Sequence, residues 1–542
     1  MHKRTVSLEK VCHTLFCLLT VLYFIGICWI NLCGRQWYHY DVYADAMIAE
    51  YIAQSRSLFP EGWLFGNQVY VFATPVVAAL FWGVTGDPIL ATGIASCLMT
   101  LLTVLSFWWC MKPFVSGKSR ALGVCCIIGG VILGSSAARD MTGLQLLYTM
   151  ASYYSCYLIV LFFTLGIWLR IFRNRLVRWY LIAACAAANL ALSMQSLREM
   201  LVLNLPLCAL TVLAVWLDRK RGRKAESRRC GFFAFGMLAA GLAGTAIFEM
   251  LSALGRVQQS TILETVDHDL IGNAAASLKV FLEFIGLTRP EAAWASVFEF
   301  CASVFLVCAV AWCLIDIIRR REFSPLTAAV IFCVISLAAV FCAGIVAINL
   351  RPAYYFVWRV LTALALMYCA EKITRPGLRL MILFCAILIG SVNFAVNFGN
   401  DLDSYLEDRA FYRSVTEQLE EDDVSHIFYD NNSVEEAPFI GAFSGGRIIC
   451  GAFFMNKNHL VPEDLLAPIQ YLQSEAWFSR ENVSRCYVLI GEKRWNMLAE
   501  DAYGAYREEL LSHLTLVHHV TYEDKSYYFY APDSALLDDL TG

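Results

Sequence analysis

Residues 69–86, VYVFATPVVAALFWGVTG, form an apolar stretch whose place relative to the membrane decides the fold. The chain has 542 residues, of which 58% are hydrophobic and 16% charged, and its mean hydropathy is +0.56. Such values exclude a soluble fold for about the first 400 residues and are typical of proteins with many membrane-spanning helices.

Eleven other apolar segments have the length, about 17 to 25 residues, that is needed to cross roughly 30 Å of hydrocarbon. They begin near Cys12, Ile89, Ala121, Met141, Trp179, Met200, Cys230, Ser296, Pro325, Ala353 and Leu378. Basic residues precede the first segment, so the positive-inside rule places the amino terminus in the cytoplasm. The first segment has no small-residue cleavage site after it, which indicates a retained helix and not a secretory signal.

Stretch 69–86 is the one apolar run that the charge distribution does not allow to cross. If it crossed, the basic connectors 170–178 and 219–229 would lie outside, against the positive-inside rule. If it lies on the outer surface, every basic connector falls inside: 112–120, 170–178, 219–229, 319–321 and 372–379. Pro75, Gly83 and the aromatic residues also favour an interfacial helix, although an ordinary short spanning helix is the alternative.

Eleven crossings divide the chain into a transmembrane domain, residues 1–399, and a C-terminal extracytoplasmic domain, residues 400–542. Within the first domain we expect a first outer loop at 34–88 and a long outer loop at 251–295. Residues 400–542 carry 26 acidic and 10 basic side chains, whereas the rest of the chain carries 20 and 32. This acidic outer lobe is unsuited to nucleic acid or to anionic lipid.

Residue patterns in the outer lobe predict a small α/β domain. We expect helices at 404–419, 462–478 and 493–511, strands at 426–429, 447–451 and 485–490, and a hairpin at 514–530 that turns near Glu523 and Asp524. The lobe has no phosphate loop, glycine fingerprint or metal-ligand spacing. Of the 21 cysteines, Cys450 and Cys486 belong to the lobe and could form a disulfide in an oxidising compartment.

The first outer loop carries the acids that are best placed for chemistry. Asp41 and Asp45 are four residues apart, so on a helix they share one face at about 6 Å between Cβ atoms, while Glu50 points elsewhere. Two close carboxylates raise one pKa or attract a cation. The alternative is a solvated amphipathic helix with its acids in water.

Four arginines in or next to short outer connectors are exceptions to the positive-inside rule: Arg139, Arg198, Arg351 and Arg359. An anion at the outer surface would explain them, because the guanidinium fork suits phosphate and stays charged when desolvated. The alternative is local ion pairing, Arg139 with Asp140 and Arg198 with Glu199. In the long outer loop, His268 and Asp269 belong to a segment that could close over a lipid groove or form a plain solvated turn.

The acid after the first span, the pair Gly62-Trp63, the aromatic-flanked Pro75 and a Phe-Trp-Gly before the second span resemble the GT-C glycosyltransferase superfamily. The pattern is most similar to its protein O-mannosyltransferase and lipid A aminoarabinose transferase branch and covers about 220 residues. It departs from that branch at Ala73-Thr74-Pro75-Val76, which is apolar where relatives carry a charge beside the proline.

The resemblance implies a GT-C-like membrane enzyme that transfers a sugar from a polyprenyl-phosphate donor to a glycan, lipid or protein acceptor. Asp41 would be the base, Asp45 or Asp140 would orient the acceptor or hold a divalent cation (Mg²⁺ or Mn²⁺), and the arginines would bind the donor phosphate. The expected location is a bacterial plasma membrane. The alternatives are a lipid or sugar flippase or transporter, a glycan polymerase or ligase, and a non-catalytic scaffold.

Overall fold

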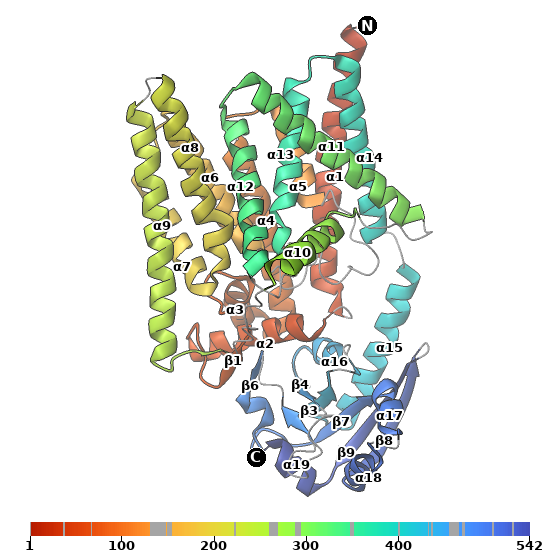
Figure 1. Ribbon diagram of the computed structural model, residues 1–542. Coiled ribbons are helices and arrows are strands. Elements are labelled where there is room, and N and C mark those ends of the chain that lie inside the picture. The colour runs from red at the N-terminus through yellow and green to blue at the C-terminus, as the bar shows by residue number, and fades with distance from the viewer. Residues whose placement is uncertain are drawn as a thin grey trace.

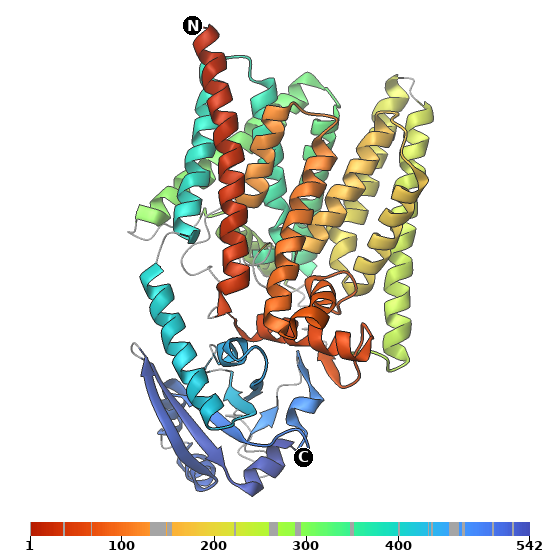
Figure 2. The ribbon, with the colours of Figure 1, turned by 180° about the vertical axis from the view of Figure 1, so that it is seen from behind.

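The computed structural model describes most of the chain. The described residues are 2–35, 38–66, 68–129, 148, 154–221, 224–259, 269–287, 294–346, 352–398, 402–431, 433–434, 437–454, 466–468, 472–500, 503–522 and 525–541. They form a bundle of long helices with a mixed α/β lobe at one end, and the amino terminus lies at the other end (Figures 1 and 2). The protein is a polytopic α-helical membrane protein with a C-terminal sheet-containing domain.

Eight helices in the described part of the chain are long and apolar enough to cross a membrane. These spans are Leu8–Cys33 in α1 (His2–Cys33), Pro88–Met111 (α4), Ser155–Phe172 (α6), Met200–Leu217 in η3 and α8 (Met200–Asn204 and Leu205–Arg221), Arg228–Ala253 in α9 (Lys224–Ala253), Val297–Arg320 in α11 (Trp294–Arg320), Pro325–Val346 (α12) and Pro376–Ala395 in α14 (Pro376–Phe398). Each has an expected counterpart, although α6 begins at Ser155 and the expected start at Met141 lies outside the described residues.

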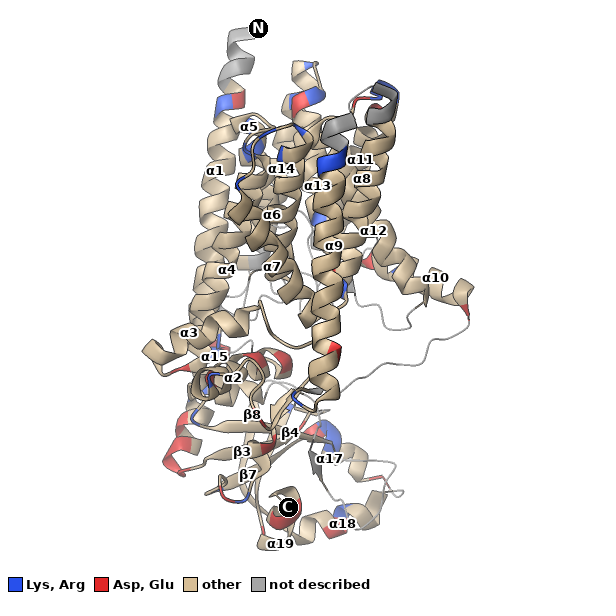
Figure 3. Ribbon diagram, turned by 90° about the vertical axis from the view of Figure 1, so that its left-hand side faces the viewer, with Lys and Arg blue, Asp and Glu red and all other residues tan. Residues whose placement is uncertain are grey.

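Three further expected crossings correspond to helices of 13 to 17 residues: α5 (Gly117–Gly129), α7 (Trp179–Gln195) and α13 (Val357–Lys372). The count of eleven therefore stays a prediction. Figure 3 shows Lys and Arg gathered at the end of the bundle that is remote from the lobe. This is the distribution that the positive-inside rule requires if the lobe lies outside.

The stretch 69–86 becomes a short helix, α3 (Thr74–Thr85), at the lobe end of the bundle (Figures 2 and 3). The helix begins five residues later than we expected, because Pro75 occupies its first turn and Ala73 is extended. Twelve helical residues extend over about 18 Å, which is too short for the hydrocarbon core. Its Leu80 and Val84 are 76% and 88% exposed, as suits side chains that face lipid.

The lobe contains a six-stranded mixed sheet of order β5-β4-β3-β7-β9-β8. Strands β4 (Ile449–Phe454), β3 (His426–Asp430) and β7 (Cys486–Gly491) are parallel, and β9 (Lys525–Pro532) and β8 (Leu514–Tyr522) add the hairpin that we expected. The helices are α15 (Leu402–Glu421), α16 (Pro438–Phe443), α17 (Glu492–Leu498), α18 (Gly504–Ser512) and α19 (Ser534–Thr541). Predicted helix 493–511 is thus divided between α17 and α18.

The predicted helix at 462–478 is wrong where the structure describes it. Residues there form β5 (Ala467–Pro468), β6 (Gln473–Ser474) and the 3₁₀ turn η5 (Glu475–Phe478). Strand β6 is not part of the six-stranded sheet of the lobe. It pairs with β1 (Trp63–Phe65), which also pairs with β2 (Gln258–Gln259). Three distant parts of the chain therefore meet in a small second sheet, and this long-range pairing outweighs the local helical pattern.

The sequence leaves open whether Cys450 and Cys486 form a disulfide, and the structure shows that both cysteines are free. Cys450 is in β4 and Cys486 is in β7, and β3 lies between these two strands. Two strand spacings separate them by about 9.5 Å, beyond the roughly 7 Å between Cα atoms that a disulfide can bridge.

The lobe packs directly on the first outer loop through α2 (Tyr40–Ser55). The Tyr43 hydroxyl donates to the Ile448 carbonyl at 3.3 Å and accepts the Cys450 N–H at 3.3 Å. Arg35, just after α1, forms an ion pair of 2.7 Å with Asp87 and donates to the carbonyls of Ala442 and Phe443 at 2.9 and 3.3 Å. Lobe, loop and bundle therefore form one continuous structure at this junction.

Gly441→Ala tests this docking. The added Cβ would lie 2.5 Å from the Tyr43 ring, so we expect the substitution to lower the free energy of unfolding by about 1 to 3 kcal/mol. The measurement is the thermal midpoint of the detergent-solubilised protein. Gly504→Ala, whose Cβ would meet no atom within 4 Å, is the control. Equal midpoints for the two variants would contradict a close contact between α16 and α2.

Candidate active site

The two acids of the first outer loop lie in the first turns of α2, as the spacing predicts. Asp41 is half-buried, and no hydrogen bond or ion pair connects its carboxylate to another described residue. Burial raises the pKa of Tyr429 in β3, and the charge of Asp41 adds to this effect, so the lobe reaches the start of α2. A carboxylate in this first turn is also stabilised by the helix dipole.

Asp45 is in a different environment from Asp41. It is 1% exposed, and its Oδ1 accepts a hydrogen bond from the Tyr70 hydroxyl. Tyr70 belongs to the extended segment between β1 and α3, so Asp45 ties that segment to α2. Glu50 faces elsewhere and accepts from Gln54 at 2.8 Å, while burial raises its pKa.

The same extended segment reaches the end of α7. The backbone N–H of Val71 donates to Gln195 Oε1 at 3.4 Å, and Gln68 Oε1 lies 3.5 Å from Nη1 of Arg198. Residues 68–71 thus connect the acids of α2 with the turn between α7 and η3. One continuous set of contacts joins Asp45, Tyr70 and Arg198.

Arg198 is held by aromatic rings. Its guanidinium carbon lies 4.6 Å from the ring centre of Tyr354, 4.9 Å from that of Tyr154 and 5.7 Å from that of Tyr157. Tyr154 and Tyr157 belong to the start of α6, and Tyr354 belongs to η4 (Pro352–Tyr355). Ring faces stabilise a cation without cancelling its charge. The guanidinium therefore stays available to an anion.

The local alternative for Arg198, an ion pair with Glu199, is not what the structure shows. Glu199 is 0% exposed, and neither carboxylate oxygen has a hydrogen-bond partner among the described residues. The ion pairs found in the described part of the chain include none with Arg198. Because the neighbouring acid does not neutralise it, the anion-binding interpretation of Arg198 is the stronger one.

Helix α13 places Arg359 close to the same region. Phe356, at the N-cap of α13, stacks on Tyr154 with ring centres 5.2 Å apart. Arg359 follows one turn later and is 3% exposed, inside the bundle. The start of α13 therefore packs against the aromatic residues that surround Arg198.

The long outer loop contains an amphipathic helix, α10 (Leu270–Phe284), whose N-cap is Asp269. The Asp269 carboxylate accepts the Gly272 N–H at 2.9 Å, so its role in the structure is that of a helix cap. The Tyr355 hydroxyl donates to the Ser277 carbonyl at 3.4 Å, and the Phe281 ring lies 5.1 Å from that of Tyr355. Helix α10 consequently covers η4, next to the three tyrosine rings that surround Arg198.

Four of the sequence-predicted site residues lie outside the described residues: Arg139, Asp140, His268 and Arg351. For a divalent cation, the described chain offers Asp41 and Asp45, and no group of three or more His, Cys, Asp or Glu side chains gathers among the residues that the structure describes. Asp45 Oδ1 is already engaged by the Tyr70 hydroxyl.

Comparison with known proteins gives a result at the level of structure. No protein-family model matches the sequence, and no curated protein sequence matches it. ArnT from Cupriavidus metallidurans bound to undecaprenyl phosphate is similar with a TM-score of 0.54 and 11% identity, over 97% of this chain and 98% of ArnT. Its apo state gives the same score and identity over 94% and 97%.

The protein has an ArnT-like fold. The similarity includes the lobe, because it covers nearly the whole of both chains. The resemblance inferred from the first 220 residues is thereby confirmed for the fold.

Sequence reasoning missed the tyrosines. Tyr154, Tyr157 and Tyr354 come from two segments about 200 residues apart, and each alone resembles an ordinary interfacial aromatic residue. Tyr70 likewise appeared to be one more aromatic residue in an apolar stretch. Periodicity gave no sign of either contact.

Tyr70→Phe tests the link between α2 and the extended segment. Removing one donor from a buried carboxylate should lower the free energy of unfolding by about 1 to 3 kcal/mol. Tyr180→Phe is the control, because the Tyr180 hydroxyl binds Arg178 at an exposed site, where the change should be within about 0.5 kcal/mol. Denaturation of the purified protein measures both. A smaller effect at Tyr70 than at Tyr180 would rule the link out.

Proposed function

We propose that the protein is a membrane glycosyltransferase. It would transfer a sugar from a polyprenyl-phosphate carrier to an acceptor at the membrane surface on which the lobe lies. The observation that carries the proposal is the Arg198 guanidinium, surrounded by three tyrosine rings and joined through residues 68–71 to the acid-bearing helix α2. The fold supports it, because ArnT has been solved with undecaprenyl phosphate.

Arg198 would bind the donor phosphate. When the glycosidic bond to phosphate breaks, negative charge builds on the leaving oxygen, and a guanidinium at that point lowers the barrier. One well-aimed donor of this kind contributes about 3 kcal/mol. No acid is needed for departure, because the phosphate leaves as a stable anion. Arg359, one turn after Phe356 in α13, is 3% exposed inside the bundle and has no assigned part in this step.

Asp41 would act as the general base. The acceptor hydroxyl attacks the anomeric carbon, its proton passes to the Asp41 carboxylate, and the bond from that carbon to the phosphate oxygen breaks. A carboxylate suffices, since the proton needs to move only after positive charge has developed on the sugar. Asp41 makes no hydrogen bond to the other described residues, so its carboxylate is available to accept a proton from the acceptor hydroxyl.

Asp45 is better suited to positioning than to proton transfer. Its 1% exposure and its bond to Tyr70 fix the segment that carries Gln68 toward Arg198. The cap at Asp269 starts α10, which covers η4 and could close over the lipid-linked donor. Ala73, Thr74 and Val76 around Pro75 are uncharged, so this part of the chain offers a substrate no charged contact.

The distribution of charge indicates on which side of the membrane the reaction takes place. With Lys and Arg gathered at the far end of the bundle, the lobe and the site face the outer side of the plasma membrane. The activated sugar reaches that side on its lipid carrier, so no nucleotide-binding domain is required.

Asp41→Asn should lower turnover by about 10²- to 10⁴-fold, since the amide cannot accept the proton. Release of undecaprenyl phosphate from a panel of undecaprenyl-phosphate sugars in membranes measures this, because that product is common to every sugar and acceptor. Glu50→Gln, nine residues along the same helix, should leave turnover unchanged. Full release by the Asp41 variant at equal expression would mean that Asp41 is not the base.

Arg198→Gln should weaken binding of undecaprenyl phosphate by about 10- to 100-fold, as expected for a lost charge-assisted hydrogen bond. Arg198→Lys should give an intermediate affinity, since it keeps the charge but loses the planar fork. Titration of the purified proteins with undecaprenyl phosphate measures the affinities, and Arg178→Gln, in an exposed connector, is the control. Unaltered affinity in Arg198→Gln would remove the anion site.

A further inference from the structure

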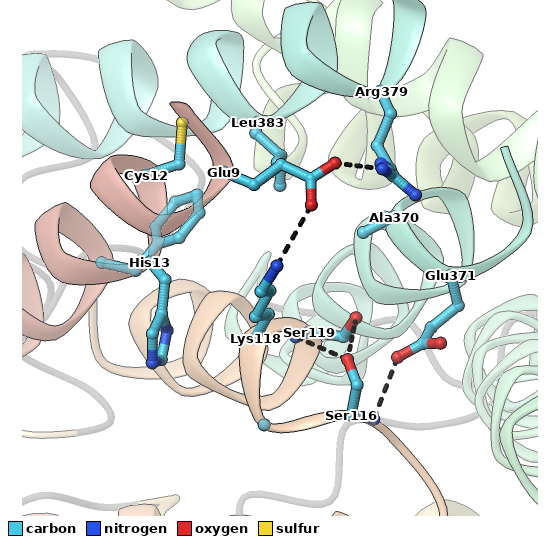
Figure 4. Close-up of a pocket in the computed structure, with 12 residues that line it drawn as sticks. Glu9, Cys12, His13, Ser116, Lys118, Ser119, Ala370, Glu371, Arg379 and Leu383 are labelled. Atoms are coloured by element: carbon cyan, nitrogen blue, oxygen red, sulfur yellow. Dashed lines mark hydrogen bonds and ion pairs between the residues drawn. The ribbon is translucent and has the colours of Figure 1, made fainter. Parts of the chain in front are cut away.

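A polar pocket lies at the opposite end of the bundle from the lobe, far from α2 and Arg198. Helices α1, α5, α13 and α14 form its walls, and Figure 4 shows the side chains that line it. Its volume is 540 Å³, within the range of about 300 to 1,000 Å³ that is typical of small-ligand sites. The proposed glycosyl transfer makes no use of this pocket.

Two bases and two acids face the pocket. Glu9 binds Lys118 through one carboxylate oxygen, at 3.2 Å, and Arg379 through the other (Figure 4). Glu371 accepts the Ser116 N–H at 2.9 Å, just before α5. Counted together, Glu9 and Glu371 balance the charges of Lys118 and Arg379. A purely anionic ligand would therefore meet two carboxylates, and a purely cationic ligand would meet two cations.

The pocket still has hydrogen-bonding capacity. Lys118 has three N–H donors and Arg379 has five, and Glu9 uses one contact from each. Nε of Arg379 and Nδ1 of His13 are buried atoms without a hydrogen-bond partner among the described residues. Lys118 is 49% exposed and Arg379 31%, so an incoming phosphate can reach both.

The depth of the pocket matches the head-group region of a membrane. Glu9 and His13 are in the first two turns of the apolar span that begins at Leu8. One turn deeper, Phe16 of α1 and Leu383 of α14 supply an apolar wall. A ligand would thus meet charge at the rim and hydrocarbon beneath it, as a phospholipid does at the boundary of its head group.

We propose that this pocket binds the head group of a zwitterionic aminophospholipid, with the lipid phosphate on Lys118 and Arg379 and the primary ammonium on Glu9 and Glu371. A primary ammonium donates N–H bonds to carboxylates, which the quaternary ammonium of a choline lipid cannot do. A glycerol head group offers no cation for the two acids. The site is therefore selective for an ethanolamine-type head group over both.

The test compares lipids on the purified full-length protein. Native mass spectrometry from lipid-free detergent, with phosphatidylethanolamine, phosphatidylcholine or phosphatidylglycerol added at equal concentration, should show preferential retention of phosphatidylethanolamine. Lys118→Met should reduce that retention by about tenfold or more, since a charge-assisted bond to phosphate is lost. Lys118→Arg should keep it.

Lys112→Met is the matched control, because Lys112 is at the same end of the bundle but packs over Trp108, outside the pocket. It should retain the lipid as the wild type does. Thermal midpoints in lipid-free detergent show whether Lys118→Met is folded, and if it is not, Lys118→Gln replaces it. Equal retention of the three lipids, or equal loss in Lys112→Met and Lys118→Met, would overturn the proposal.

A competition experiment distinguishes a lipid ligand from a soluble one. Soluble phosphoethanolamine should displace bound phosphatidylethanolamine only weakly, because it lacks the acyl chains that lie against the apolar wall. Displacement by phosphoethanolamine or inorganic phosphate at the concentration of the lipid itself would show a site for a soluble phosphate and contradict the lipid assignment.

Discussion

The burial of α2 between the bundle and the lobe is the constraint on which the rest of the structure depends. A loop that lies at a membrane surface would normally leave its acids in water, where their orientation is free. Here nine apolar residues of α2 are buried, and Tyr43 is hydrogen-bonded to the backbone on both sides of Ile449. The lobe therefore fixes the position of α2 and of the acids that it carries.

The second requirement is a cation that stays charged without an acid beside it. Removing an arginine from water is costly, and a carboxylate partner would offset the cost but also cancel the charge that a phosphate needs. The three rings around Arg198 offset part of that cost through their faces, and Gln68 and Tyr354 also hydrogen-bond to it, all without an opposing charge. The buried, unpaired Glu199 next to it shows that sequence adjacency did not produce an ion pair.

Different interactions stabilise the two ends of the bundle. At the lobe end, aromatic and apolar contacts hold α2, α3 and the lobe together, beside the ion pair of Arg35 with Asp87. At the far end, Glu9 is shared between Lys118 and Arg379, so ionic contacts tie α1, α5 and α14 together. Partly buried ion pairs are more persistent than surface pairs, because the surrounding lipid and protein reduce screening.

The sequence by itself determined the membrane class, the existence of the lobe, most of its strands, and the placing of Asp41 and Asp45 on one helix, because hydropathy and residue periodicity are local properties. It also singled out Arg198, since an arginine in a short outer connector conflicts with the charge rule. Only the tertiary structure decided the rest. Residues 473–474 became a strand through pairing with 63–64, and Cys450 and Cys486 were kept apart by an intervening strand. The partners of Arg198 come from segments up to about 160 residues away, and side chains brought together by packing leave no periodic trace in the chain.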